Sequence, residues 1–292
     1  MKVGISLTSN HPDAKDPREG ARWMIERTAA AHRAGLDSLF VGDQHVSPTP
    51  YYQNTPMLGR LLAEWGETPA GCRGETPAGC LFLLPLWHPV LVAEQIGTLA
   101  AIAKGRFIMQ CGLGYGEARF AAMGRLFEEA LDIVRRLLAG ETVSSSRRFH
   151  VAEASLALRP AEPVEVWIGA SAPPAIDRAA RLAEGWIASP GLTPAEARAQ
   201  ADLHRECCAA YGRQPTAIAL RRDIYVAQSS SEVQAVLQQA VSRGYRGTKA
   251  ETCAKMFSVV QSFGQRLAKS LDRSATCSIN ITAVLKLQGW AA

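Results

Sequence analysis

The sequence predicts an α/β protein whose strands close into a TIM (β/α)8 barrel. Short runs rich in Val, Ile and Leu alternate with longer amphipathic segments along the 292 residues, which is typical of a parallel sheet covered by helices. Eight such runs match the strand number of the barrel. An open doubly wound sheet also alternates in this way, but no Gly-x-Gly-x-x-Gly turn follows the first run, and this favours the barrel. We expect a single domain over residues 1–292.

The individual elements follow from hydrophobic periodicity and from Pro and Gly at the ends of segments. The expected strands are 3–7, 38–41, 80–84, 107–111, 165–168, 186–188, 222–227 and 279–285. The expected helices are 18–34, 56–64, 125–139, 173–184, 194–211, 231–243 and 253–269. Apolar residues recur at three- and four-residue steps within the first of these helices, and Gly140 follows the third as a stop signal.

Composition excludes several classes of protein. Hydrophobic residues make up 47% and charged residues 20%, which argues against a disordered chain. The net charge of +5 is scattered, without a basic block, so we expect no nucleic-acid partner. Pro85, His88 and Pro89 interrupt the longest apolar segment, and we expect no membrane span or secretory leader. An odd count of 7 cysteines without zinc-finger spacing predicts reduced thiols, no metal and a cytoplasmic location.

Catalytic residues of such barrels lie on the loops at the carboxyl ends of the strands. Five loops should therefore converge: TSNHP (8–12), GDQHV (42–46), PLWHP (85–89), GLGYGEARF (112–120) and GASAPP (169–174). No Gly-x-Ser-x-Gly elbow, Walker loop or His-Glu-x-x-His motif is present, so hydrolase, nucleotide-triphosphatase and zinc-protease functions have no support.

GASAPP is the most informative of these loops. Small residues allow a ligand to approach closely, a helix is expected to begin at the proline pair, and Ser171 adds a hydroxyl donor. The start of a helix attracts phosphate groups. The residues of GASAPP are equally consistent with a turn of small residues that only packs the helix against the barrel.

Two other loops carry candidate residues. The glycines of GLGYG would let the backbone approach a flat cofactor, although such turns are common. GDQHV offers Asp43 and His45, and a histidine there could donate or accept a proton. A structural hydrogen bond is the commoner role of an isolated histidine, and the same holds for His11 and His88.

Four collinear stretches resemble the bacterial luciferase-like flavin-dependent oxidoreductases. They are GLDSLFVGDQH (35–45), LLPLWHPVLVAEQIGTLAAIAKGRF (83–107), KGRFIMQCGLGYGEARFAAMG (104–124) and VWIGASAPPAIDRAARLAEGWI (166–187). The resemblance covers residues 1–228 and fades beyond Gly247. Together with the residues above, it is the main indication of function.

The resemblance implies a dimeric TIM barrel that oxidises or reduces a small organic substrate, with reduced FMN and oxygen or with the deazaflavin coenzyme F420. The phosphate would meet Gly169, Ala170 and Ser171, and Gly112 and Leu113 would lie beside the ring. A non-proline cis peptide, expected at Cys80-Leu81, would support the ring from below, and Gln44 and His45 would face the reacting atoms. Tyr51 and Tyr52 suggest an aromatic substrate wall.

The chain departs from the family pattern in several places. Gln44 replaces the first histidine of a pair that many family members carry. The loop after Gly124, which often supplies an arginine to the phosphate, is shortened, and Arg125 is the suggested substitute. The last βα unit is expected to be imperfect. GETPAGC occurs twice, at 66–72 and 74–80; the second copy should enter the third strand, and the first should loop out at the amino end. A non-catalytic flavin-binding or structural barrel, and a cofactor-independent binding protein, are therefore the alternatives.

Overall fold

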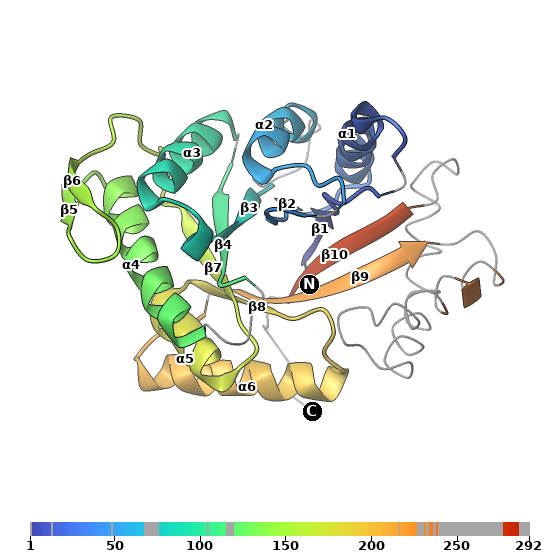
Figure 1. Ribbon diagram of the computed structural model, residues 1–292. Helices are drawn as coiled ribbons and strands as arrows, with labels where there is room; N and C mark the ends of the chain where they lie inside the picture. The colour runs from blue at the N-terminus through green and yellow to red at the C-terminus, as the bar shows by residue number, and fades with distance from the viewer. Residues whose placement is uncertain are drawn as a thin grey trace.

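The computed structural model describes residues 2–12, 14–47, 49–66, 76–103, 105–114, 120–215, 217–226 and 277–285, and the single positions 231, 234, 235 and 238. For residues 120–122, 223–226 and 277–285 only the backbone is described. Figure 1 labels the helices and strands in chain order. They are β1 (Lys2–Leu7), α1 (Pro17–Arg33), β2 (Leu39–Val41), α2 (Asn54–Trp65), β3 (Ala78–Leu83), η1 (Leu84–Leu86), α3 (Pro89–Ile102), β4 (Phe107–Gly112), α4 (Phe120–Leu138), β5 (Val143–Ser145), β6 (Val151–Ala154), β7 (Glu165–Gly169), α5 (Pro173–Leu182), β8 (Gly185–Ala188), α6 (Pro194–Ala210), β9 (Ala217–Val226) and β10 (Cys277–Leu285).

The sheet is a closed barrel with the strand order β1-β10-β9-β8-β7-β4-β3-β2. Seven strands run parallel to one another, while β10 is antiparallel to both of its neighbours, β9 and β1. The barrel is thus confirmed, but a wholly parallel sheet is wrong. Val226 at the end of β9 pairs with Cys277 at the start of β10. The chain therefore enters β10 at the carboxyl end of β9 and must run back toward the amino end, which makes the last unit irregular as the sequence indicated.

Most predicted elements agree with the observed ones. Helices α1, α2, α4, α5 and α6 correspond to predicted helices, and each predicted barrel strand has a counterpart. The region 231–243 is helical at its described positions, and 253–269 lies outside the described residues. The β5–β6 hairpin, which is not part of the barrel, was not predicted.

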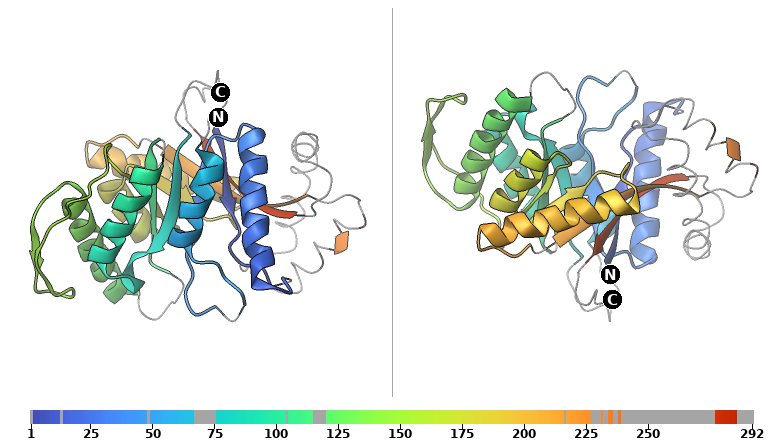
Figure 2. Two further views of the ribbon diagram at one scale, coloured as in Figure 1. Left: turned by 90° about the horizontal axis from the view of Figure 1, so that it is seen from above. Right: turned by 90° about the horizontal axis from the view of Figure 1, so that it is seen from below.

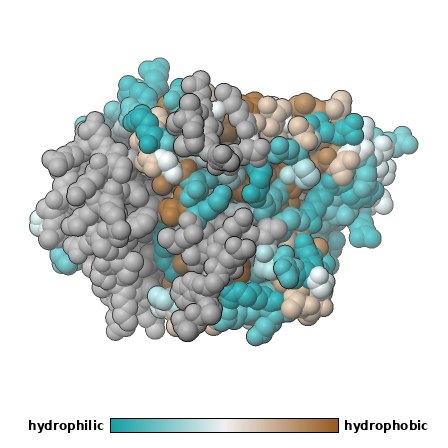
Figure 3. Space-filling model, turned by 180° about the vertical axis from the view of Figure 1, so that it is seen from behind, coloured by the Kyte–Doolittle hydropathy of each residue, from teal (hydrophilic) through white to brown (hydrophobic). Residues whose placement is uncertain are grey.

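The helices pack around the outside of the barrel (Figures 1 and 2). Asp16 and Thr193 begin α1 and α6 with reciprocal side-chain caps, and a proline follows each. Leu39, Met109, Val166 and other outward-facing strand residues form the main core against the helices. A second cluster fills the barrel interior, with Phe40, Ile108, Trp167, Ala217 and Ala219 as its buried members. On the face in Figure 3, hydrophilic side chains cover most of the described surface, and hydrophobic ones form small groups.

The second copy of the repeat enters the barrel wall as expected. Its last three residues, Ala78, Gly79 and Cys80, begin β3 and pair with β2 and β4. A Cβ atom at Gly79 would lie 1.9 Å from the carbonyl oxygen of Ile108, so only glycine permits this approach of β3 to β4. The first copy lies mostly outside the described residues.

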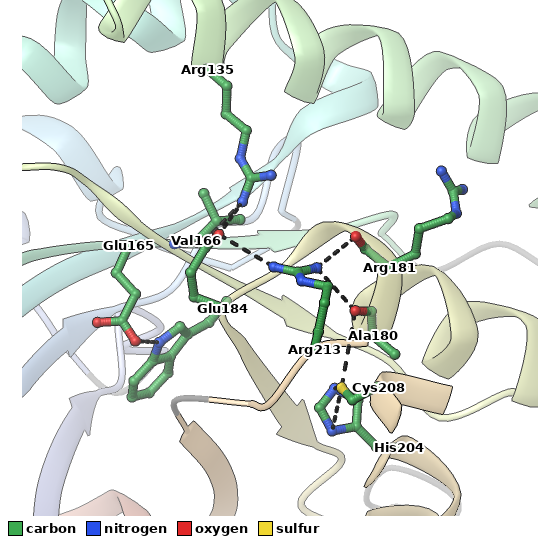
Figure 4. Close-up of polar contacts among 10 residues, drawn as sticks. Arg135, Glu165, Val166, Ala180, Arg181, Glu184, His204, Cys208 and Arg213 are labelled. Carbon is green, nitrogen blue, oxygen red and sulfur yellow. Dashed lines mark hydrogen bonds and ion pairs between the residues drawn. The ribbon is translucent and has the colours of Figure 1, made fainter. Parts of the chain in front are cut away.

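Polar contacts at the amino end of β7 and β8 join the sheet to three helices (Figure 4). Glu184 accepts hydrogen bonds from Arg135 at 2.9 and 2.8 Å and from the backbone N–H of Val166 at 2.9 Å. Arg213 approaches the same carboxylate at 3.7 Å and donates to the carbonyl of Ala180 at 3.0 Å. These contacts connect α4, α5 and β7 to the end of α6, away from the carboxyl ends of the strands.

Candidate functional site

Asp43 lies directly beyond the carboxyl end of β2, and its side chain is fully buried. Its Oδ2 atom accepts hydrogen bonds from the backbone N–H of Leu83 at 2.8 Å and from the indole N–H of Trp87 at 2.9 Å. Two donors on one oxygen fix the carboxylate plane. The other carboxylate oxygen, Oδ1, faces His45.

His45 is held against this carboxylate. Its Nε2 atom lies 3.1 Å from Oδ1 of Asp43, at ion-pair distance but without the alignment of a hydrogen bond. The ring packs edge-on against Trp87, with 5.3 Å between the centroids. Its side chain remains 29% exposed, so one edge faces solvent at the barrel mouth. A partly exposed imidazole beside a fixed carboxylate is suited to proton transfer.

Gln44 is exposed, and its backbone carbonyl accepts a hydrogen bond from Gln53 at 3.3 Å. The next turn carries Val46 at φ 49°, an uncommon conformation for a β-branched residue. Val46 is fully exposed. GDQHV therefore presents an amide and an apolar group beside His45.

Cys80 and Leu81 were expected together beneath the cofactor ring, but β3 places them on opposite faces of the sheet. Cys80 belongs to the core between sheet and helices, where burial raises the pKa of its thiol. Leu81 is half-buried, and its Cδ1 atom lies 3.7 Å from the position of a Cβ on Gly112. Only Leu81 can therefore face the barrel mouth.

The expected cis peptide between Cys80 and Leu81 is wrong. The described residues contain no cis peptide bond, and both residues pair with β4 as ordinary strand residues. The buried Asn54 of α2 donates to the carbonyl of Leu81 at 2.6 Å. That bond satisfies the carbonyl just beyond Cys80, where the pairing with β2 ends, and needs no change of peptide geometry.

Gly112 ends β4 beside the end of β3. A Cβ atom there would lie 3.4 Å from Leu83 and 3.7 Å from Leu81. Leu113 packs partly against the core, and Gly114 turns the chain at φ 84°. The end of β4 is thus an apolar ledge without a side chain at Gly112, which suits the approach of a flat ring.

Gly169, Ala170 and Ser171 form the neighbouring turn, after β7. Gly169 and Ser171 are exposed, whereas Ala170 is buried. A Cβ at Gly169 would meet only the carbonyl of Cys111, at 3.7 Å. Since β4 and β7 are paired, this turn lies next to the ledge at Gly112.

The start of α5 offers fewer amides than the sequence suggested. Pro173 and Pro174 have no N–H group, and the N–H groups of Ala175 and Ile176 both bond to the carbonyl of Ala172 at 2.9 Å. In the part of the chain that the structure describes, the N–H groups of Ser171 and Ala172 have no protein acceptor. An anion here would therefore be held by the turn before the helix.

Arg125, the suggested substitute for a phosphate-binding arginine, is exposed on α4. Among the described residues it forms no ion pair. The neighbouring Gly124 lies against the guanidinium of Arg178 from α5, which is paired with Glu128 at 2.8 Å. The second turn of α4 thus lies beside the second turn of α5, the helix that follows the GASAPP turn.

Other predicted residues have structural contacts. The hydroxyl of Tyr52 donates to the carbonyl of Pro17, and its ring packs against Gly20 of α1. His11 is buried edge-on between Trp23 and Tyr52. Tyr52 therefore anchors α1 and contributes little to a substrate wall, whereas the hydroxyl of Tyr51 lies beside Gly42 in GDQHV.

Sequence reasoning missed two tryptophans that shape the site. Trp87 was present in the quoted PLWHP loop, but only His88 was considered there. Trp186 donates its indole N–H to the carbonyl of Ala170 at 2.9 Å. A tryptophan in an apolar run is predicted to be a core residue, and the sequence does not show which group accepts a hydrogen bond from its N–H.

Over the described ranges, no cluster of three or more His, Cys, Asp or Glu residues is arranged to hold a metal ion. In the same part of the chain, no helix has the length and apolarity that a membrane span requires.

Comparisons with known proteins agree with this architecture. The F420-dependent glucose-6-phosphate dehydrogenase of Nakamurella multipartita is 28% identical over 198 residues, which are 60% of this chain and 54% of that protein. The chain thus spans about half the length of the curated relatives that it matches.

Two solved structures share the fold. Monooxygenase RslO1 from Streptomyces bottropensis is 21% identical, with a TM-score of 0.67 over 92% of this chain and 83% of that one. The oxygenating constituent of 3,6-diketocamphane monooxygenase from Pseudomonas putida, in complex with FMN, is 16% identical, with a TM-score of 0.65 over 84% and 74%. The family model for luciferase-like monooxygenases matches residues 79–276, and the chain therefore belongs to the luciferase-like monooxygenase family.

Proposed function

We propose that the protein is an oxidoreductase that binds F420, or alternatively FMN, across the carboxyl ends of β2, β3, β4 and β7. One observation carries the proposal. The Gly112 ledge and the Ser171 turn follow the paired strands β4 and β7, and Asp43 and His45 follow β2, which is separated from β4 only by β3. A ring site, a phosphate site and a proton-transfer group thus share one edge of the barrel.

The residues present fit such a cofactor. Leu81 and Leu83 border an apolar surface at Gly112, where no side chain blocks a ring. Gly169 is exposed and open, and Ser171 offers a hydroxyl and an N–H group that has no acceptor among the described residues. Arg125 is an exposed cation on α4, next to Gly124, which lies against Arg178 of α5. Bound F420 or FMN would supply a two-electron carrier.

His45 is the group that we assign to proton transfer. Asp43 lies 3.1 Å from the ring on one side, and the side chain of His45 stays 29% exposed just beyond the carboxyl end of β2. Gln44 cannot exchange protons and would donate or accept a hydrogen bond to the substrate or the ring. Val46 adds an apolar contact beside them.

F420 is the preferred cofactor in this proposal because the relative from Nakamurella multipartita is named for its dependence on F420. FMN is the alternative, because a structural neighbour with the same barrel is in complex with it. Sugar phosphates are the first compounds to test because that relative is named for glucose 6-phosphate.

The activity test follows the visible absorbance of oxidised F420 with a panel of sugar phosphates and alcohols, and in parallel the oxidation of reduced FMN. We expect turnover of one cofactor, and His45→Gln should lower kcat by about 10²-fold or more with unchanged cofactor affinity. His150→Gln, at an exposed histidine, is the control. Cofactor binding without turnover of any compound would favour the non-catalytic barrel.

A further inference from the structure

Trp186 anchors the turn that we assign to the cofactor phosphate. It lies in β8, fully buried, and its indole N–H donates to the carbonyl of Ala170 at 2.9 Å. The N–H of Ala170 donates in turn to the carbonyl of Ile187 at 3.3 Å. Both backbone groups of Ala170 are therefore held by two consecutive residues of β8.

This arrangement fixes the direction of the next N–H group. The carbonyl of Ala170 and the N–H of Ser171 belong to one planar trans peptide, in which they point in opposite directions. Because the carbonyl points to the buried indole, the N–H of Ser171 must point away from the core. Ser171 is exposed, and this N–H has no acceptor among the described residues.

We propose that Trp186 is a positioning residue that directs the N–H of Ser171 toward the phosphate of the bound cofactor. The proposal rests on the proposed function, since it concerns the same site. A reversed peptide would present a carbonyl oxygen to the anion, and a repulsive dipole would replace an attractive one. Trp186 thus acts through the peptide and touches neither ring nor substrate.

The indole is itself held in place from the other side. His204 of α6 stacks on Trp186, with 5.5 Å between the centroids and 21° between the planes. The imidazole Nε2 of His204 lies 3.7 Å from the buried thiol of Cys208, one turn further along α6. The N–H of Trp186 therefore keeps one direction before any ligand arrives, which is the preorganisation that binding requires.

The test compares two matched substitutions. Trp186→Phe keeps an aromatic ring in the core and removes the N–H donor to Ala170. Trp167→Phe is the control, because Trp167 is equally buried on the neighbouring strand and donates its N–H at 2.9 Å to Glu165, at the amino end of the barrel. Both variants lose one indole hydrogen bond, but only one of these bonds reaches the phosphate turn.

The first readout is the affinity for FMN against riboflavin, which lacks the phosphate; if the wild type binds F420 and not FMN, F420 is compared with its deazaflavin riboside without the phosphate, and the same outcomes are expected for that pair. Trp186→Phe should weaken FMN binding by about five- to tenfold and leave riboflavin binding unchanged. Trp167→Phe should alter neither affinity. Equal losses for both ligands in Trp186→Phe would mean a merely structural role and would overturn the proposal, as would unchanged FMN affinity.

The second readout observes the peptide directly. Ala-Ser occurs at 154–155, 170–171 and 188–189, so labelling Ala carbonyl carbons with ¹³C and Ser amides with ¹⁵N gives three correlated signals in an HNCO spectrum. The Ser171 signal should differ between wild type and Trp186→Phe without any ligand, while the Ser155 signal, from the β6 end outside the barrel, stays in place. An unchanged Ser171 signal would contradict the proposed orientation.

Failure of the cofactor assignment is distinguishable from failure of this inference. If the wild type binds neither FMN nor F420, the proposed function fails, and a titration with inorganic phosphate decides the role of Trp186. A shift of the Ser171 signal in the wild type that is absent in Trp186→Phe would support the positioning role. No shift in the wild type would overturn it.

Discussion

The imidazole of His204 is stacked on the indole of Trp186, and burial lowers the pKa of that imidazole to about 4. The nearby charges of Arg205 and Arg213 act in the same direction. His204 is only 1% exposed. It is therefore neutral in the folded protein at pH 7, and α6 packs against β8 through uncharged groups.

This contact predicts an acid-sensitive fold. The pKa of His204 is lower in the folded than in the unfolded state, so protonation favours unfolding. Its stabilising contribution is complete above about pH 6.5 and is lost as the pH falls toward 4. We expect a loss of about 2 kcal/mol in the free energy of unfolding between pH 7.5 and pH 5, measured by urea titration.

The variant that checks this assignment is His204→Gln, which should be less stable at pH 7.5 but lack this part of the pH dependence. His150→Gln, at an exposed position, should keep the wild-type slope. An undiminished slope in His204→Gln would mean that other groups cause the acid sensitivity.

Asp43 should determine which nitrogen of His45 carries the proton. A carboxylate at 3.1 Å from Nε2 favours the tautomer with hydrogen on that atom. Asp43→Asn can still accept from Leu83 and Trp87 but would turn an amide N–H toward His45, and the proton should move to Nδ1. Imidazole ¹⁵N chemical shifts at pH 8 measure this directly, and the same tautomer in both proteins would exclude the proposed role of Asp43.

Glu184 should contribute more to stability than an ordinary surface ion pair. Glu184→Gln weakens the contacts to Arg135 and to the N–H of Val166, and we expect a loss of about 1–2 kcal/mol. Glu141→Gln breaks an exposed pair with Arg136 and should cost less than about 1 kcal/mol. Equal shifts in Tm for the two variants would show that the contacts of Glu184 stabilise the fold no more than an exposed ion pair does.

The repeated heptapeptide offers a comparison within one sequence. Gly79→Ala in the second copy would bring a Cβ atom to 1.9 Å from the backbone of Ile108 and should destabilise by more than about 3 kcal/mol. Gly71→Ala makes the same change in the first copy, which the sequence predicts to be surplus, and should be nearly neutral. Thermal unfolding of both variants measures the difference; a large loss in Gly71→Ala would make the first copy structurally necessary.

The barrel could be predicted from sequence because apolar runs and amphipathic helices identify strands and their covering. The direction of β10 could not, since the run at 279–285 carries no mark of its direction and only its pairing with Val226 through Ile218 reveals it. Strands buried on both faces also hide which residues face inward. Cys80 and Leu81 were therefore assigned together although they lie on opposite faces.

The site could be predicted by loop but not by contact. Asp43, His45 and Ser171 have the expected position at the carboxyl ends of strands, whereas Trp87 and Trp186 became visible only through their acceptors. Their partners lie 44 and 16 residues away in sequence, beyond the reach of local patterns. The homodimer and the cytoplasmic location stay predictions.

The measurement that tests the central claim most directly is the equilibrium binding of F420 and FMN to the wild type and to Ser171→Asp, monitored through the fluorescence of the cofactor. The carboxylate would repel the phosphate, and we expect binding of one cofactor at about micromolar affinity or tighter in the wild type and its loss in Ser171→Asp. Ser155→Asp, at an exposed serine outside the site, should bind as the wild type does. Unchanged affinity in Ser171→Asp, or no binding of either cofactor by the wild type, would contradict the account.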